Sequence, residues 1–236
     1  ERSSGLQEYL AELRRIESMT VEGDIQRAKA LVIKNKRRAM TELKAKWGAP
    51  EAPWNNISAD ALWNIANTPS SQISMLGKIT GMVFAPYAAC STFGFALKLG
   101  MEAIRRGEAK FAVIGATEPS PHAMSVGTFY NARVLSADGE VSKPLTGMRG
   151  THVSGGSAIW IIGDLDYALS KGMKPLGMEP LSVGITADAD HIITPSIPGP
   201  SAAIAQAMQH ANVRPEQVRD WDMHATGTPG DYTEVQ

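Results

Sequence analysis

The single cysteine of the chain, Cys90, has a sequence environment that suits a nucleophile. It stands in the sequence Ala-Ala-Cys-Ser-Thr, between an apolar run at 82–85 and a stretch with a helical pattern. A thiol in the first turn of a helix lies close to unpaired backbone amides and to the positive end of the helix dipole, which both favour the thiolate. The alternative is a small buried hydrophobic residue, because free cysteines are among the most buried residue types.

A histidine in the last part of the sequence could act with this thiolate. His224 opens the polar sequence His-Ala-Thr-Gly-Thr-Pro-Gly-Asp, after a short run at 218–223 that could end a strand. A neutral imidazole can polarise a carbonyl or move a proton, and the hydroxyls of Thr226 and Thr228 could orient an amide-bearing ligand. A hydrogen-bonded structural histidine is the alternative. Together, Cys90 and His224 fit acyl transfer, in which the thiolate carries the acyl group and the imidazole assists a second step.

Composition limits the class of protein. With 236 residues, of which 43% are hydrophobic and 20% charged, the chain can bury one sizeable core or two smaller ones, as a soluble globular protein does. The net charge of −1 argues against a nucleic-acid partner, and the basic cluster at 34–38 is more typical of a solvated helix face than of a phosphate site. A lone cysteine excludes an internal disulfide framework, and we find neither an apolar membrane span nor a signal peptide. We therefore expect a cytoplasmic protein.

The elements that would position these residues begin after a helical first part. Apolar residues repeat at helical spacing over 6–13, and 25–47 is rich in helix-forming residues. Prolines and glycines at 48–56 predict a linker or a surface excursion. Beyond it, a strand at 79–85, a helix at 91–106 and a strand at 110–115 would form a βαβ unit with Cys90 at the bend between strand and helix.

A second unit of the same kind follows. It is predicted to comprise strands at 158–162 and 175–185 and helices at 164–171 and 200–211. Strands that alternate with helices indicate a parallel sheet covered by helices. Reactive groups in such sheets gather at the carboxyl ends of the strands, which is where this pattern puts Cys90 and His224.

Several stretches resemble motifs of the β-ketoacyl synthases, which belong to the thiolase-fold condensing enzymes. They are 67–69 with 72–74, 89–91, 102–109, 115–118, 133–136 up to Pro144, 188–195 and 224–234, the last of which is similar to the family's His-Gly-Thr-Gly-Thr motif. Each motif is a moderate signal, and their shared order makes the resemblance specific over 67–236. It implies an α/β fold with thiolase-like duplicated βαβ layers, α-β-α-β-α, present in part.

The resemblance also implies an activity, the decarboxylative Claisen condensation of an acyl thioester with malonyl carried on acyl carrier protein, in fatty acid or polyketide biosynthesis. By this resemblance, Cys90 is the nucleophile and His224 is the first catalytic histidine. Thr226 and Thr228 contact the pantetheine arm. His191 matches a position near the entrance of that arm, although a hydrogen-bonded or surface histidine explains it as well. The alternative is a non-catalytic, chain-length-factor type of subunit that shapes a partner's acyl tunnel.

The resemblance further implies partners and domain limits. Members of the family are usually homodimers through an edge strand near the cysteine half, so we expect a homodimer or a ketosynthase-like partner subunit. We expect a divergent helical segment with its linker at 1–56, an N-terminal ketosynthase half at 57–172 and the start of the C-terminal half at 173–236. No cofactor is expected, because phosphopantetheine arrives on the carrier protein. Residue spacing suggests no metal site, and His122, His152 and His210 are expected to be structural or solvated.

Some residues depart from the family pattern. Ala225 replaces a glycine of the histidine motif, and only Pro229 separates Thr228 from Gly230, where the family usually has two residues. The stretch at 149–156 lacks the acidic residue and the phenylalanine that are common at its counterpart. In the family, a second catalytic histidine and a lysine follow the histidine motif, beyond the position that matches Gln236. We expect a divergent subfamily and an internal piece of a longer synthase; a naturally short relative completed by a partner chain is the alternative.

Overall fold

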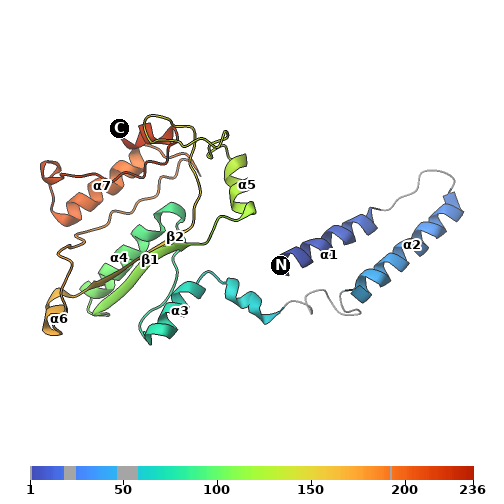
Figure 1. Cartoon of the computed structure of the whole chain (residues 1–236), viewed down its shortest axis with the longest axis horizontal. Coiled ribbons are helices and arrows are strands. Elements are labelled where there is room, and N and C mark those ends of the chain that lie inside the picture. The colour runs from blue at the N-terminus through green and yellow to red at the C-terminus, as the bar shows by residue number, and fades with distance from the viewer. Residues whose placement is uncertain (1, 19–24, 47–57, 192) are drawn as a thin grey trace. The chain divides into compact units, whose positions relative to one another are not determined.

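The computed structural model describes residues 2–18, 25–46, 58–191 and 193–236 (Figure 1). The chain divides into two compact units, Glu1–Val83 and Phe84–Gln236. The linker predicted at 48–56 lies outside the described residues. The predicted domain limits at 56 and 172 stay predictions. No helix of the described ranges combines the length and the apolar character that crossing a membrane requires.

The first unit begins with a helical hairpin. Helices α1 (Arg2–Glu17) and α2 (Ile25–Lys46) run antiparallel and bury Ile16 and Leu43. An exposed ion pair joins Lys46 Nζ to Glu8 Oε1 at 2.5 Å, and such surface pairs contribute little to stability. The hairpin confirms the helical pattern read over 25–47.

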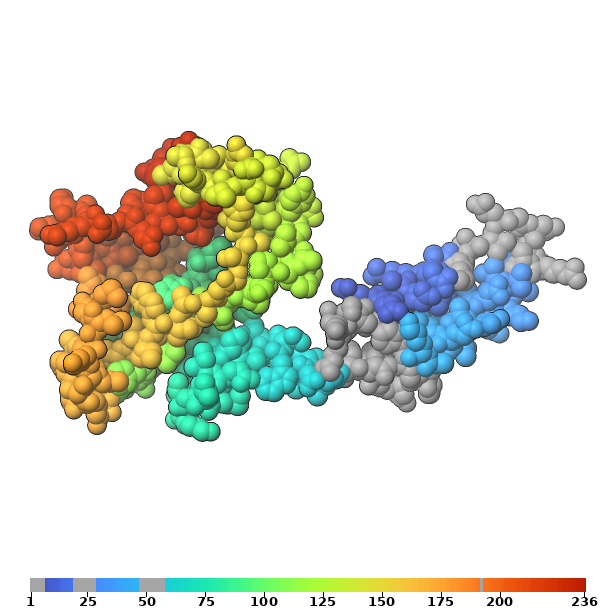
Figure 2. Space-filling view, viewed as in Figure 1, coloured from blue at the N-terminus to red at the C-terminus, as the bar shows by residue number. Residues whose placement is uncertain are grey.

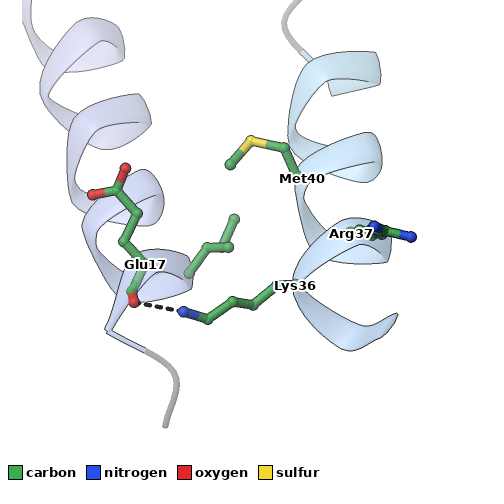
Figure 3. A pocket seen from close by; sticks show the side chains of 5 residues that line it. Glu17, Lys36, Arg37 and Met40 are labelled. Carbon is green, nitrogen blue, oxygen red and sulfur yellow. Dashed lines mark hydrogen bonds between the residues drawn. The ribbon is translucent and has the colours of Figure 1, made fainter. Parts of the chain in front are cut away.

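A shallow pocket lies between the two helices of this hairpin (Figure 3). Its apolar part comes from Ile16 and Met40, and Lys36 Nζ donates a hydrogen bond of 2.7 Å to the carbonyl oxygen of Glu17. A lysine at this position satisfies one of the carbonyls that the last turn of a helix leaves without an intrahelical donor. The unit ends with a 3₁₀ segment η2 (Ala59–Asn64) and helix α3 (Thr68–Gly77).

The core of the second unit is a helix on a sheet. Helix α4 (Thr92–Arg105) packs against strands β1 (Phe111–Glu118) and β2 (Gly156–Gly163). Gly100 allows this close approach, because a Cβ there would lie 2.8 Å from Ile114 Cγ2. Met101 and Ala103 of α4 and Ile114 of β1 are buried. The helix and both strands were predicted from the sequence.

The direction of the sheet was predicted wrongly. The two strands are antiparallel, with Phe111 opposite Gly163 and Glu118 opposite Gly156, and they form the one sheet of the described residues. The stretches at 79–85, 175–185 and 218–223, which we expected to be strands, have no regular strand structure. A parallel sheet of βαβ units is therefore not what these residues form.

The segment at 181–186 shows why an apolar run need not become a strand. Arg105 of α4 donates to the carbonyl of Leu181 at 2.6 Å, and the amide of Ile185 donates to Gln206 Oε1 at 2.7 Å. Gln206 belongs to helix α7 (Pro198–Ala211). Side chains of α4 and α7 thus take two of the backbone groups that a strand would pair with a neighbouring strand.

The remaining helices are short. They are α5 (Ala123–Asn131), α6 (Leu165–Ser170) and α8 (Gly230–Glu234), with 3₁₀ segments η3 (Ala89–Ser91) and η4 (Pro215–Gln217). The Asp164 side chain accepts the amide of Tyr167 and so caps α6, while α7 ends at Asn212 in the left-handed conformation with φ +53°. These caps confirm the helices predicted at 164–171 and 200–211.

One face of the sheet is open to solvent. Helix α4 covers the face that carries Ile114 and Ile162, whereas Val113, Ile159 and Ile161 on the opposite face are 39%, 45% and 73% exposed. The second unit therefore carries a cluster of exposed apolar side chains on this face of its sheet.

Candidate active site

Cys90 lies at the sharp start of α4. It is the middle residue of η3, and Ala89 before it has φ +48°, in the left-handed region that is unfavourable for a residue with a Cβ. Thr92 holds this bend, because its hydroxyl accepts the amide of Ala88 at 3.1 Å and donates to the carbonyl of Ala89 at 2.7 Å. The Cys90 side chain is exposed rather than buried as a structural cysteine would be.

His224 lies in the loop before α8, and Glu234 of α8 bonds back to the start of that loop. The backbone amide of His224 donates to Glu234 Oε1 at 2.5 Å, and the next amide, of Ala225, donates to Glu234 Oε2 at 2.9 Å. Ala225 has φ +42°, so the carboxylate stabilises a turn that a residue with a Cβ adopts at a cost. His224 is an exposed residue at the start of this loop.

Asp231 organises the rest of this loop from inside. It is 1% exposed, and its Oδ2 accepts the amide of Gly227 at 3.0 Å and the amide of Leu145 at 3.4 Å. The carbonyl of Gly227 in turn accepts the amide of Gly150 at 3.1 Å and the hydroxyl of Ser142 at 3.0 Å. The loop of 224–231 is thereby bonded to residues about 80 positions earlier, and the two segments lie together in Figures 1 and 2.

Only glycine fits at the centre of this junction. Gly227 has φ +77°, and a Cβ on it would lie 2.8 Å from Ser142 Oγ. Neither Asp231 nor Ser142 was predicted from the sequence. Asp231 follows Gly227 and Gly230 and lies in the first turn of a short helix, and this pattern could have marked it in the sequence. Its distant partner, Leu145, could not be predicted from the residues around Asp231.

The two threonines of the motif are part-buried and bonded to one another. Thr226 Oγ1 and Thr228 Oγ1 are 3.0 Å apart, and Thr226 Oγ1 lies 3.3 Å from Asp231 Oδ1. The amide of Gly230 donates to Thr228 Oγ1 at 3.3 Å. The structure therefore brings Thr226 and Thr228 together, in the same loop as His224.

His191 lies apart from that loop in the chain and structures its own turn. Its Nδ1 accepts the amides of Ile193 at 3.1 Å and Thr194 at 3.0 Å, so the neutral ring carries its proton on Nε2. The hydrogen-bonded alternative is thus observed, and contact with substrate stays a prediction.

The carboxylate of Asp188 stabilises the same turn. It accepts both the hydroxyl and, at 2.7 Å, the amide of Ser196. These bonds, the hydroxyl first, hold the pKa of Asp188 below its ordinary value.

Other histidines have structural partners. His122 caps α5 by accepting the amide of Met124 at 3.1 Å, and His152 Nε2 lies 3.1 Å from the carbonyl of Glu140. His210 lies in the last turn of α7. Across the ranges that the structure describes, no group of three or more histidine, cysteine, aspartate or glutamate side chains could hold a metal ion.

Family models match most of the chain. The model described as β-ketoacyl synthase, N-terminal domain, matches residues 32–166, and the C-terminal domain model matches 180–236. The first match begins inside α2 and includes Cys90, while the second includes the loop of 224–231.

Curated relatives carry ketosynthase names. The mitochondrial 3-oxoacyl-[acyl-carrier-protein] synthase of Arabidopsis thaliana is 31% identical over 181 residues, which are 73% of this chain and 39% of the relative. A 3-oxoacyl-[acyl-carrier-protein] synthase 2 of Synechocystis is 34% identical over 156 residues, 63% of this chain and 37% of the relative. The chain thus spans less than half the length of these relatives.

Solved structures agree on the fold. A beta-ketoacyl synthase from Burkholderia phymatum matches with TM-score 0.71 at 18% identity, over 84% of this chain and 48% of that one. The ishigamide ketosynthase/chain length factor matches with TM-score 0.63 at 25% identity, over 72% of this chain and 42% of that one.

A third structure is described as a type II polyketide acyl-carrier protein in complex with its ketosynthase. It matches with TM-score 0.70 at 19% identity, over 84% of this chain and 52% of that one. The expected thiolase-like α/β fold, present in part, is confirmed. With more than half of its residues matched by the N-terminal domain model alone, the chain belongs to the β-ketoacyl synthase family.

Proposed function

We propose that this chain forms part of a β-ketoacyl synthase that extends an acyl thioester by decarboxylative Claisen condensation. The observation that carries the proposal is the position of Cys90, an exposed thiol at the strained start of a helix of 14 residues. A cysteine sulfur is a nucleophile for acyl transfer, and the exposure of Cys90 leaves it accessible to a thioester. The names of the curated relatives support the same reaction class.

The first step is acyl transfer to the thiol. The Cys90 sulfur attacks the carbonyl carbon of the incoming thioester, a new S–C bond forms, and the pantetheine sulfur leaves and takes up a proton. Negative charge develops on the carbonyl oxygen during the attack. Amides at the start of α4, that of Cys90 included, are suited to stabilise it because they point toward the N-terminal end of the helix.

The second step forms the carbon–carbon bond. The malonyl thioester loses carbon dioxide, and the electron pair of the broken bond moves into an enolate whose oxygen accepts a hydrogen bond from the imidazole of His224. The enolate carbon attacks the acyl carbonyl on Cys90, and the Cys90 thiolate leaves. Thr226 and Thr228 hold the pantetheine arm during this step.

A second candidate function has one observation in its favour. The match to a ketosynthase/chain length factor allows a non-catalytic subunit that shapes a partner's acyl tunnel. Such a subunit has no evident need of a thiol at a strained bend, so the exposed Cys90 favours the enzyme.

The proposal includes partners and a compartment. The substrates arrive on acyl carrier protein, which in one of the similar structures is in complex with its own ketosynthase. The open sheet face of Val113, Ile159 and Ile161 supports a homodimer or a ketosynthase-like partner subunit. Ile161→Lys would then lower the mass measured by light scattering; an unchanged mass would contradict this use of the face. A lone reactive thiol suits a reducing compartment, and we place the protein in the cytoplasm.

Acyl loading tests the proposed function directly. The full protein is incubated with an acyl-pantetheine thioester, and the acyl adduct is measured by intact mass and peptide mapping. Because Cys90 is the single cysteine of these residues, the modified peptide is known in advance. We expect loading in the parent and none in Cys90→Ala. A folded parent that stays unmodified would count against catalysis and favour the non-catalytic subunit.

A further inference from the structure

Asp231 is the one buried charged side chain among the described residues, and the proposed reaction gives it no role. Its Oδ2 accepts two backbone amides, those of Gly227 at 3.0 Å and Leu145 at 3.4 Å. Its Oδ1 lies 3.3 Å from the hydroxyl of Thr226. The Thr226 hydroxyl is the donor in this contact, so the proton between Thr226 and Asp231 belongs to Thr226.

The direction of this first bond fixes the next one. A hydroxyl has a single proton, and Thr226 gives its proton to Asp231. The contact of 3.0 Å between the hydroxyls of Thr226 and Thr228 is then a hydrogen bond only if Thr228 donates. The result is a relay of two hydroxyl protons, from Thr228 to Thr226 and from Thr226 to the buried carboxylate.

The relay leaves acceptors and no donors for a ligand. Each hydroxyl oxygen has two lone pairs. One pair on Thr226 takes the proton of Thr228, and one pair on Thr228 takes the amide of Gly230 at 3.3 Å. One lone pair remains on each threonine, while both protons point inward. Both side chains are only part-buried, so these lone pairs can meet a ligand.

We propose that Asp231 sets the direction of this relay, so that Thr226 and Thr228 recognise an amide N–H of the substrate arm and not its carbonyl. The inference rests on the proposed function, which supplies an arm that contains amides. Asp231 does not touch the ligand and is a positioning residue. Thr226 and Thr228 supply the contact that selects the substrate.

Ligand analogues that lack a single N–H test the proposal without any chemistry at the thiol. The full protein with Cys90→Ala is titrated in a calorimeter with S-propyl pantetheine, a thioether that cannot acylate the protein. Two analogues carry CH₂ in place of N–H, one at each amide, and keep both carbonyls. We expect one of them to bind about tenfold more weakly than the parent ligand, which is the size of a single net hydrogen bond.

Variants of the relay connect that loss to Asp231. In Asp231→Asn the new amide group can donate to Thr226, so the relay can reverse, and the tenfold discrimination should fall below about threefold. Thr228→Val should lose the discrimination in the same way. It leaves Asp231 unchanged, so it tests the relay even if Asp231→Asn misfolds. Thr228→Ser keeps the hydroxyl and should retain the discrimination. Asp166→Asn removes an equal charge from the exposed face of α6 and should change nothing.

Each result supports or overturns the inference. The inference is overturned if the Cys90→Ala protein binds S-propyl pantetheine and both CH₂ analogues equally well. It is also overturned if Asp231→Asn keeps the tenfold difference in affinity. If S-propyl pantetheine does not bind and Cys90 is never loaded, the proposed function fails instead. The relay is then judged by NMR of the free protein: the Thr226 hydroxyl proton should exchange slowly with water in the parent and faster in Asp231→Asn. Rapid exchange in the parent would contradict the relay.

Discussion

The bend at Cys90 and the loop at His224 are held in different ways. The bend depends on one neighbour, Thr92, which bonds to Ala88 and Ala89 within five residues of chain. The loop depends on Asp231 and Gly227, whose partners lie at 142–150. A nucleophile can thus be positioned by the local start of a helix, whereas the second group needs a junction between distant segments. Damage to the loop should cost more stability than damage to the bend.

The largest expected effect is on catalysis, where the Cys90 bend serves acyl loading and the His224 loop serves condensation. His224→Ala should leave acyl loading of Cys90 nearly unchanged and slow condensation with malonyl about 10²–10⁴-fold, because the imidazole stabilises charge only in the second step. Loading is measured by mass spectrometry and condensation by product formation with the full protein. His210→Ala, in the last turn of α7, is the matched control. Equal loss of both steps would show that the regions do not divide the reaction in this way.

Gly227→Ala should lower the free energy of unfolding more than any substitution at the Cys90 bend. The variant combines a left-handed φ with a clash against Ser142, and we expect a loss of about 2–4 kcal/mol in the free energy of unfolding. Gly139→Ala isolates the backbone part, because Gly139 has φ +72° and nothing within 4 Å of an added Cβ. That control should lose about 1 kcal/mol in denaturant titrations. Equal losses would mean that the junction with Ser142 contributes nothing.

Thr92→Val should have a smaller effect, confined to the bend. It removes two hydrogen bonds at the start of α4 and should cost about 1–2 kcal/mol, together with a slower alkylation of Cys90 by iodoacetamide. Thr92→Ser keeps both bonds and should restore both quantities. A normal alkylation rate in Thr92→Val would show that other contacts hold the bend.

The smallest effect concerns pH and the turn that contains His191. The pKa of Asp188 is lowered, so this carboxylate stabilises the fold at pH values above its ordinary range, and the contribution disappears as the pH falls through the folded-state pKa. The unfolding midpoint of the parent should therefore drop more steeply on acidification below pH 4 than that of Asp188→Asn. Parallel curves for the two proteins would contradict this contribution.

Local patterns were enough to predict most helices. Periodicity lies inside an element, and an end signal such as Asp164 lies directly next to it, so α6 and α7 could be predicted from neighbouring residues. The same holds for Cys90 at a helix start. The family resemblance, which the comparisons confirm, placed His224 and both threonines in one motif.

Long-range relations could not be read in this way. The run at 175–185 is apolar enough for a strand, but Arg105 and Gln206 each take one of its backbone groups instead. The antiparallel pairing of β1 with β2 depends on segments about 45 residues apart. Asp231 matters because of Leu145 and Thr226, and only the first of these contacts is distant in sequence. Contact between segments far apart in the chain was the missing information.

The central claim is that the Cys90 sulfur and the His224 imidazole share one substrate, and a nitroxide label tests it most directly. The single cysteine takes the label at one known position, and the imidazole signals of the five histidines are followed by NMR. We predict strong broadening of the His224 signal, which reduction of the nitroxide reverses. A His224 signal unchanged by the label in the folded protein would contradict the account.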